Sequence, residues 1–246
     1  MGAQRNKTIA IIPARGGSKR IPDKNIRLFC GKPIISYSIS TALRSKLFDK
    51  VIVSTDSERI ASVAKEYGAD VPFIRPAELA DDYSGIDSVI LHALDWLDGK
   101  GESGQYACCI HATAPLMQVS SLQDGFKILK AVGGTSVFSV AEYPAPVLRS
   151  LKIDKTGRVA PYWPDSFKMR SQDLPAAYHD AGQFYWIDVD KYRTVKRMCG
   201  EDSYAITLPR HTVQDIDSKC DWQMAELLYR LINESPSLLS GNVDVL

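Results

Sequence analysis

The chain has 246 residues, of which 45% are hydrophobic and 24% are charged, and its 30 Lys and Arg nearly balance its 29 Asp and Glu. This composition predicts a globular protein with one large core, and it excludes a protein whose whole surface attracts nucleic acid or an anionic membrane. The N-terminus is short and polar, and the five cysteines contain no C-x-x-C pair. We therefore expect a cytoplasmic protein without a signal peptide, a membrane span, a zinc site or a disulfide framework.

Strand and helix patterns alternate through the first half of the chain. Apolar runs predict strands at 8–12, 51–53, 71–74 and 106–110. Helical periodicity predicts helices from about Pro33, at 57–67, at 84–97 and at 120–132. This order predicts an α/β fold of Rossmann-like architecture, in which a mostly parallel sheet carries helices on both faces and binds ligands at the carboxyl ends of its strands.

The region at about 135–188 breaks this alternation. Its strand-like runs at 136–141, 147–153 and 184–187 are separated by five prolines and accompanied by Trp163, Phe167 and Tyr178. We interpret the region as a β-rich insertion into a single domain that spans 1–246. The insertion is either a dimerisation arm or a flap over the protein's own core. A strand at 204–208 and a helix at 218–233 complete the predicted domain.

The segment after the first predicted strand is rich in glycine and cations. Gly16 and Gly17 give the backbone unusual freedom and expose its N–H groups, and four cations flank them: Arg15, Lys19, Arg20 and Lys24. Exposed amides beside cations form a site for a polyphosphate, which indicates a nucleoside triphosphate. The spacing matches neither the Walker A motif nor G-x-G-x-x-G. The alternative is a solvated basic loop.

A pair of carboxylates near the end of the chain predicts a metal site. Asp215 and Asp217 share a side only if their segment is extended, and two carboxylate oxygens with room for water and phosphate suit Mg²⁺. The alternative is helix capping, because Ser218 and Asp221 form a capping box and Asp217 could also cap the helix. A cationic loop and a Mg²⁺ site together are what nucleotidyl transfer at an α-phosphate requires.

Six segments, in order, resemble the nonulosonate (sialic-acid-type) cytidylyltransferases: 12–25, 53–56, 75–80, 113–116, 170–175 and 215–217. The resemblance implies CTP as the donor, a nine-carbon sugar acid as the acceptor, Mg²⁺ as the cofactor, and a homodimer whose arms cross. It implies CTP-binding roles for Ala14, Arg15, Gly16, Ser18, Lys19, Lys24, Asn25 and Arg75. It also implies that Arg15, Lys19, Asp215 and Asp217 are catalytic and that the two aspartates hold the metal.

The runs at 111–116 and 178–186 resemble the pseudaminic acid branch of this family, whereas sialate-activating relatives usually carry Gln-Pro-Thr-Ser at 111–114 and Gly at Arg20. We therefore expect CMP transfer from CTP to the anomeric hydroxyl of pseudaminic acid, with release of pyrophosphate. The resemblance implies the sugar-binding residues His111, Thr113, Arg170, Gln183 and Tyr185, with Arg170 facing the sugar carboxylate. A buried, purely structural His111 is the alternative. The alternative substrates are N-acetylneuraminic and legionaminic acid, and the alternative protein class is a non-catalytic CTP-binding regulator.

Overall fold

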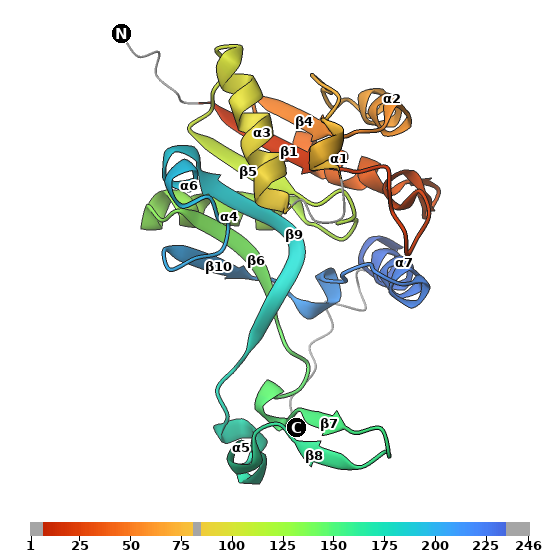
Figure 1. The fold of residues 1–246 in the computed structure, drawn as a ribbon, viewed down its shortest axis with the longest axis vertical. Coiled ribbons are helices and arrows are strands. Elements are labelled where there is room, and N and C mark those ends of the chain that lie inside the picture. Colours follow the sequence, from red (N-terminus) through yellow and green to blue (C-terminus); the bar gives the residue numbers. More distant parts are fainter. Residues whose placement is uncertain (1–6, 81–84, 235–246) are drawn as a thin grey trace.

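The computed structural model describes residues 7–80 and 85–234. Its centre is a six-stranded sheet in the order β10-β6-β9-β5-β1-β4 (Figure 1). The strands are β1 (Thr8–Pro13), β4 (Lys50–Ser54), β5 (Tyr106–Ile110), β6 (Ser136–Glu142), β9 (Tyr178–Asp188) and β10 (Ser203–Thr207). Strand β1 is parallel to β4 and β5, and β10 is parallel to β6, whereas β9 is antiparallel to both of its neighbours. The predicted α/β class with a mostly parallel sheet is confirmed.

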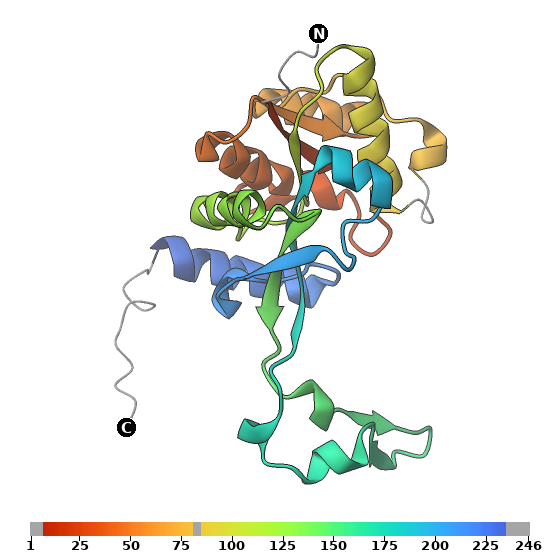
Figure 2. The same ribbon diagram turned by 90° about the vertical axis from the view of Figure 1, so that its left-hand side faces the viewer.

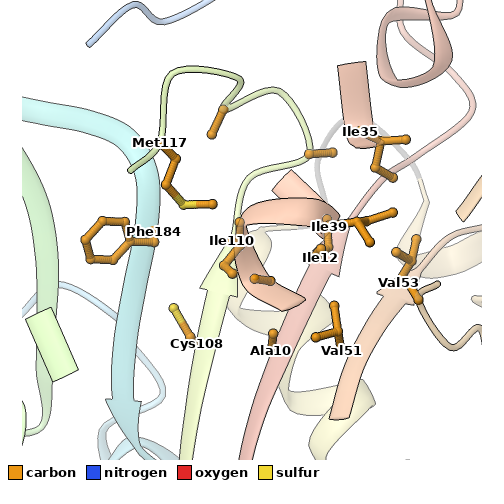
Figure 3. Close-up of a cluster of buried hydrophobic side chains, with 14 of the residues drawn as sticks. Ala10, Ile12, Ile35, Ile39, Val51, Val53, Cys108, Ile110, Met117 and Phe184 are labelled. Atoms are coloured by element: carbon orange, nitrogen blue, oxygen red, sulfur yellow. The ribbon is translucent and has the colours of Figure 1, made fainter. Parts of the chain in front are cut away.

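Helices cover both faces of this sheet. Their bounds are α1 (Ile34–Ser45), α2 (Glu58–Glu66), α3 (Ile86–Gly99), α4 (Val119–Val132), α6 (Val189–Val195) and α7 (Lys219–Glu234). Because successive strand side chains point to opposite faces, Ala10 and Ile12 pack in one buried cluster, with α1, α2 and α4, while Ile9 and Ile11 pack in another, with α3 and α6. Figure 3 shows the first cluster, with Ile39 of α1 among the β1 and β4 side chains. Among the described helices, none is long and apolar enough to cross a membrane.

The strand predicted at 71–74 does not form. Residues Asp70 and Ile74 make only isolated bridges, to Ile52 and Thr55. Pro72 lies between them and has no amide to donate to a ladder, so the segment follows β4 without extending the sheet. The helix predicted from Ser84 begins at Ile86, and Ser84 itself lies outside the described residues.

The boundaries predicted for the insertion were too wide. Strands β6 and β9, at its two ends, are part of the main sheet, and only residues 143–177 project from it. The prolines that suggested an insertion all lie inside this shorter segment, while the flanking apolar runs are the buried strands expected in the middle of a sheet. The predicted strand at 147–153 is also shorter, because a 3-10 turn at Val147–Arg149 precedes strand β7.

The projecting segment, residues 143–177, is called the arm below. It contains the hairpin of β7 (Leu151–Ile153) and β8 (Val159–Pro161), followed by the short helix α5 (Pro164–Lys168). Figures 1 and 2 show it beyond the ends of β6 and β9, away from the helices that cover the sheet. Between 143 and 173 no hydrophobic side chain is buried, so this part of the arm has no core of its own.

Candidate active site

The predicted phosphate loop crosses the sheet at the carboxyl ends of β1 and β5. It forms one wall of an open pocket of about 290 Å³. The pocket brings together side chains from the loop, from the segment after β4 and from the segment after β5: Arg15, Ser18, Lys19, Arg20, Lys24, Asn25, Arg75, His111 and Thr113. Eight of the predicted substrate-binding residues from distant parts of the sequence, together with Arg20, thus line a single cavity at the expected edge of the sheet.

The loop is held by hydrogen bonds at its start. The Ala14 amide donates to the Ser54 carbonyl, and the Gly16 amide donates to Asp56 Oδ1, both at 2.9 Å. Asn25 Nδ2 donates to the Arg15 carbonyl at 2.9 Å, which closes the loop on itself. Ala14 and Gly16 therefore shape the loop but are not among the residues that line the pocket.

The glycines act differently from the sequence-based expectation. Neither Gly16 nor Gly17 has a positive φ, so neither needs a conformation closed to other residues. A Cβ on Gly16 would lie 3.2 Å from Ser57 Cβ, whereas a Cβ on Gly17 would meet nothing within 4 Å. Glycine is needed at position 16 because α2 approaches closely, and the Gly16 amide is directed to Asp56 rather than into the pocket.

Arg75 is a buried wall of the pocket, with only 5% of its surface exposed. Its Nη2 donates to the Ser54 carbonyl at 2.8 Å and its Nη1 donates to the Leu79 carbonyl at 3.2 Å. Burial lowers the pKa of the guanidinium, while the nearby Asp56 charge opposes this shift. Its Nε has no hydrogen-bond partner among the described residues. A buried cation that has no paired carboxylate at hydrogen-bond distance within residues 7–80 and 85–234 is suited to an anionic ligand.

The two aspartates flank a buried anchor. Ile216 is fully buried in a cluster with Ile21, Phe29 and Trp222, and this fixes the segment beside the loop. Asp217 Oδ1 lies 2.7 Å from Arg20 Nη2 and 3.6 Å from Lys24 Nζ, and Lys24 also donates to the Ile216 carbonyl.

The capping box predicted at the start of α7 is confirmed. Asp221 Oδ2 accepts from the Ser218 amide at 2.7 Å, and the Ser218 hydroxyl accepts from the Asp221 amide at 3.2 Å. The Ser218 hydroxyl, which also donates to this carboxylate, is the main cause of a lowered pKa at Asp221. Because Asp221 caps the helix, Asp215 and Asp217 are left for another role.

The donor set at these aspartates fits Mg²⁺. Asp215 is exposed and Asp217 is partly exposed, next to the cationic loop. Within residues 7–80 and 85–234, no group of three or more His, Cys, Asp or Glu side chains forms a ready-made metal cage. Two carboxylates that leave coordination positions for water and phosphate oxygens suit Mg²⁺, which keeps several waters and is commonly shared with substrate phosphates.

Polar side chains from β9 and from the end of β5 continue the site beside Asp215. The Tyr185 hydroxyl donates to the Asp180 carboxylate, and the Tyr185 ring lies 5.5 Å from the His111 ring. Burial lowers the pKa of His111, although Asp180 and Asp215 oppose the shift, so the imidazole is held neutral. A Cβ on Gly182, whose φ is +62°, would approach both Asp215 Oδ1 (3.8 Å) and His111 Nδ1 (3.9 Å).

Two buried polar atoms in this region have no partner among the described residues: His111 Nε2 and Gln183 Oε1. Gln183 is fixed by its other end, because its Nε2 donates to the Thr212 carbonyl. Unpaired buried polar atoms are costly, so a polar ligand that reaches them would recover lost hydrogen bonds.

Arg170 is not brought into the pocket of its own chain. It lies in the arm between α5 and the 3-10 turn Ser171–Asp173, where its Nε is 2.8 Å from Asp173 Oδ2. Arg149 is in the arm as well, and its guanidinium donates to the Met169 carbonyl.

Three residues make contacts at the site that the sequence did not predict. Asp56 binds the Gly16 amide, Asp180 accepts from Tyr185, and Arg20 pairs with Asp217. Asp56 could have been found from its place directly after the strand at 51–53. Arg20 was expected as a cation of the phosphate loop but not as a partner of Asp217, and Asp180 carried no signal beyond its place in the run at 178–186.

The architecture is that of a nucleotide-binding α/β protein, with a cationic loop at the carboxyl edge of a sheet covered on both faces. Residues 9–200 match the family described as Cytidylyltransferase. Pseudaminic acid cytidylyltransferase of Campylobacter jejuni is 40% identical over 235 residues, which cover 93% of this chain and 99% of that protein. CMP-N,N'-diacetyllegionaminic acid synthase of Legionella pneumophila is 31% identical over 93% of this chain and 99% of its own length.

A solved structure has a similar fold. CMP:2-keto-3-deoxy-manno-octonic acid synthetase complexed with CTP superposes with a TM-score of 0.66 at 13% identity, over 91% of this chain and 98% of that one. The chain belongs to the cytidylyltransferase family, and it is a CTP-dependent cytidylyltransferase.

Proposed function

We propose that this enzyme transfers CMP from CTP to the anomeric hydroxyl of pseudaminic acid, which yields CMP-pseudaminic acid and pyrophosphate. The enzyme is a cytidylyltransferase that acts on a nonulosonic acid. The observation that carries the choice of pseudaminic acid is the 40% identity to the Campylobacter jejuni enzyme over 93% of the chain. The departures from sialate-activating relatives at Arg20 and His111 support the same choice, because both residues line the pocket.

The cationic side of the pocket would hold the triphosphate of CTP. Ser18, Lys24, Asn25 and Arg75 line this pocket, and Lys24 Nζ lies 3.6 Å from Asp217 Oδ1. Arg15 and Lys19 would stabilise the charge that develops on the phosphates during transfer, which is the largest contribution expected at such a site. Ala14 and Gly16 would support this role by fixing the loop.

Asp215 and Asp217 would hold Mg²⁺ beside the cationic loop, where the metal would also contact the phosphates of CTP. Nucleotidyltransferases typically use a divalent metal, which when bound neutralises phosphate charge and aligns the reacting groups.

The sugar acid would lie against β9 and the end of β5. The neutral His111 and Gln183 present unpaired polar atoms to it, and Thr113 and Tyr185 would complete the polar wall. Arg170 would bind the carboxylate of the sugar from the arm of a second subunit, since it does not line the pocket of its own chain. We therefore propose a homodimer with crossing arms, working in the cytoplasm.

A substrate panel tests this function. Purified enzyme is incubated with CTP, Mg²⁺ and pseudaminic, N,N'-diacetyllegionaminic or N-acetylneuraminic acid, and pyrophosphate release is measured for each. We expect the highest kcat/KM with pseudaminic acid. A higher value with either of the other two sugars would overturn the substrate assignment and leave the cytidylyltransferase activity in place.

A further inference from the structure

Arg20 connects the two charged parts of the site. Its side chain lines the pocket with the other loop cations, and its Nη2 lies 2.7 Å from Asp217 Oδ1. One guanidinium therefore lies between the proposed triphosphate site and the proposed metal site. Lys24 Nζ is 3.6 Å from the same carboxylate oxygen, so Arg20 makes the closer of these two ion pairs.

Buried neighbours hold this pair together. Ile21 follows Arg20 in the chain and Ile216 precedes Asp217, and both isoleucines are buried in one cluster with Phe29. The backbones on either side of the ion pair are thus fixed by the same apolar contacts. The two charged side chains remain at the surface of this cluster, with 71% of Arg20 and 42% of Asp217 exposed.

The ion pair is easy to exchange. A pair with this exposure changes an equilibrium by only about two- to fivefold. A cation that binds Asp217 weakens its pairing with Arg20, because the cation and the guanidinium repel each other at contact distance. A triphosphate in the same pocket offers the released guanidinium a more highly charged partner, and guanidinium groups bind phosphate in bidentate geometry.

We propose that Arg20 is an exchangeable counter-ion that pairs with Asp217 in the nucleotide-free enzyme and moves to the triphosphate when nucleotide and metal bind. This inference rests on the proposed function, which assigns Asp217 to the metal. Arg20 then weakens metal binding to the nucleotide-free enzyme, and it strengthens nucleotide binding when the metal occupies Asp217. By linkage, it makes the binding of each ligand favour the other.

The test compares Arg20→Gln with a matched variant, Arg59→Gln. Arg59 also pairs with an exposed aspartate, Asp23, at 3.2 Å, and its side chain is likewise 71% exposed. Mn²⁺ binding to the nucleotide-free enzyme is measured by electron paramagnetic resonance, and CTP binding with Mg²⁺ present is measured by equilibrium dialysis. We expect Arg20→Gln to bind Mn²⁺ about two- to fivefold more tightly and CTP at least about twofold more weakly. Arg59→Gln should change neither.

The outcomes separate this inference from the proposed function. If Arg20→Gln weakens CTP binding without tightening Mn²⁺ binding, Arg20 is a simple phosphate contact and the exchange is overturned. Asp217→Asn in the same Mn²⁺ titration reports on the metal site itself. Unchanged Mn²⁺ affinity in Asp217→Asn would refute the metal assignment, whereas its loss, together with unchanged affinity in Arg20→Gln, refutes only the exchange.

Discussion

At the scale of single residues, the charged groups of this site are positioned by apolar neighbours in the chain. Ile216 is buried between Asp215 and Asp217, and Ile21 is buried next to Arg20. Asp217 therefore stays near the loop although it is exposed in part, and the free energy that holds it comes from burial of the isoleucines rather than from the weak ion pairs. Substitution of the charges should consequently change chemistry far more than stability.

Asp217→Asn tests this separation of chemistry from stability. We expect kcat to fall about 100-fold or more, because several kcal/mol of charge stabilisation by the metal would be lost. The free energy of unfolding should change by less than about 0.5 kcal/mol, as is usual for exposed positions. Pyrophosphate release and urea unfolding measure the two effects. Asp124→Asn, which removes an exposed carboxylate paired with Lys127, is the control and should change neither.

Gly16→Ala and Gly17→Ala form a second matched pair. The added methyl at position 16 would lie 3.2 Å from Ser57 Cβ, while the one at position 17 has open space. We expect Gly16→Ala to shift the loop by a few tenths of an ångström and to raise the KM for CTP about three- to tenfold. Gly17→Ala should stay within about twofold of the wild type. Equal effects of the two substitutions on KM would contradict a packing role for Gly16.

At the scale of elements, the spacing of apolar residues predicted the helices and the central strands. It did so because the buried face of each element determines where apolar residues recur. The buried run at 106–110 is β5, and the helix predicted at 57–67 is α2, which the Ser57 hydroxyl caps by accepting from the Ile60 amide. The prediction of a strand at 71–74 was wrong because Pro72 has no amide to donate to a neighbouring strand. The apolar residues around it outweighed this signal in the prediction. The runs at 136–141 and 184–187 were predicted to lie outside the main sheet. In the structure β9 pairs antiparallel between β5 and β6, and this pairing is decided by tertiary contacts. No periodicity in the sequence reports it.

The same division holds for the site. The place of the loop at a cationic pocket could be predicted, because its residue types and spacing follow from the chemistry of phosphate. The metal role of the aspartate pair stays a prediction. The ion pair between Arg20 and Asp217 could not be predicted, because it depends on α7 packing against the loop through Trp222 and Ile21.

The start of α7 gives a prediction for pH. Hydrogen bonds from Ser218, opposed by some desolvation, lower the pKa of Asp221 in the folded protein. Its contribution to stability is therefore present above the ordinary pKa of an aspartate and is lost as the pH falls through the lowered value. Asp221→Ala should cost about 1 kcal/mol of unfolding free energy at pH 7, and the difference from wild type should shrink in acid. Urea unfolding from pH 7 to pH 3 measures this, and a difference independent of pH would contradict it.

At the scale of the whole molecule, the arm and the pocket are each incomplete. The arm exposes large apolar side chains without a core beneath them: Leu151, Ile153, Val159, Tyr162, Trp163 and Phe167. The pocket has cations for a triphosphate, but Arg170, the guanidinium proposed to bind the sugar carboxylate, lies in the arm. A second copy of the chain would cover the exposed apolar side chains of the arm, and its Arg170 would complete the pocket. Both contacts would occur twice, because a two-fold interface repeats every contact.

Mixing two inactive variants tests whether the arm serves the partner's site. In a crossed dimer, a subunit with Arg170→Ala and a subunit with Asp217→Asn form one intact site, which combines Asp217 of the first with Arg170 of the second. After random exchange of equal amounts, half of the dimers are mixed and each has one working site of two, so about a quarter of wild-type activity should return. The mixture is unfolded and refolded together, and pyrophosphate release is compared with that of each variant refolded alone. If Arg170 served its own chain, both sites of every mixed dimer would lack one group. Activity would then stay at the mean of the two variants, and the crossed arrangement would be wrong.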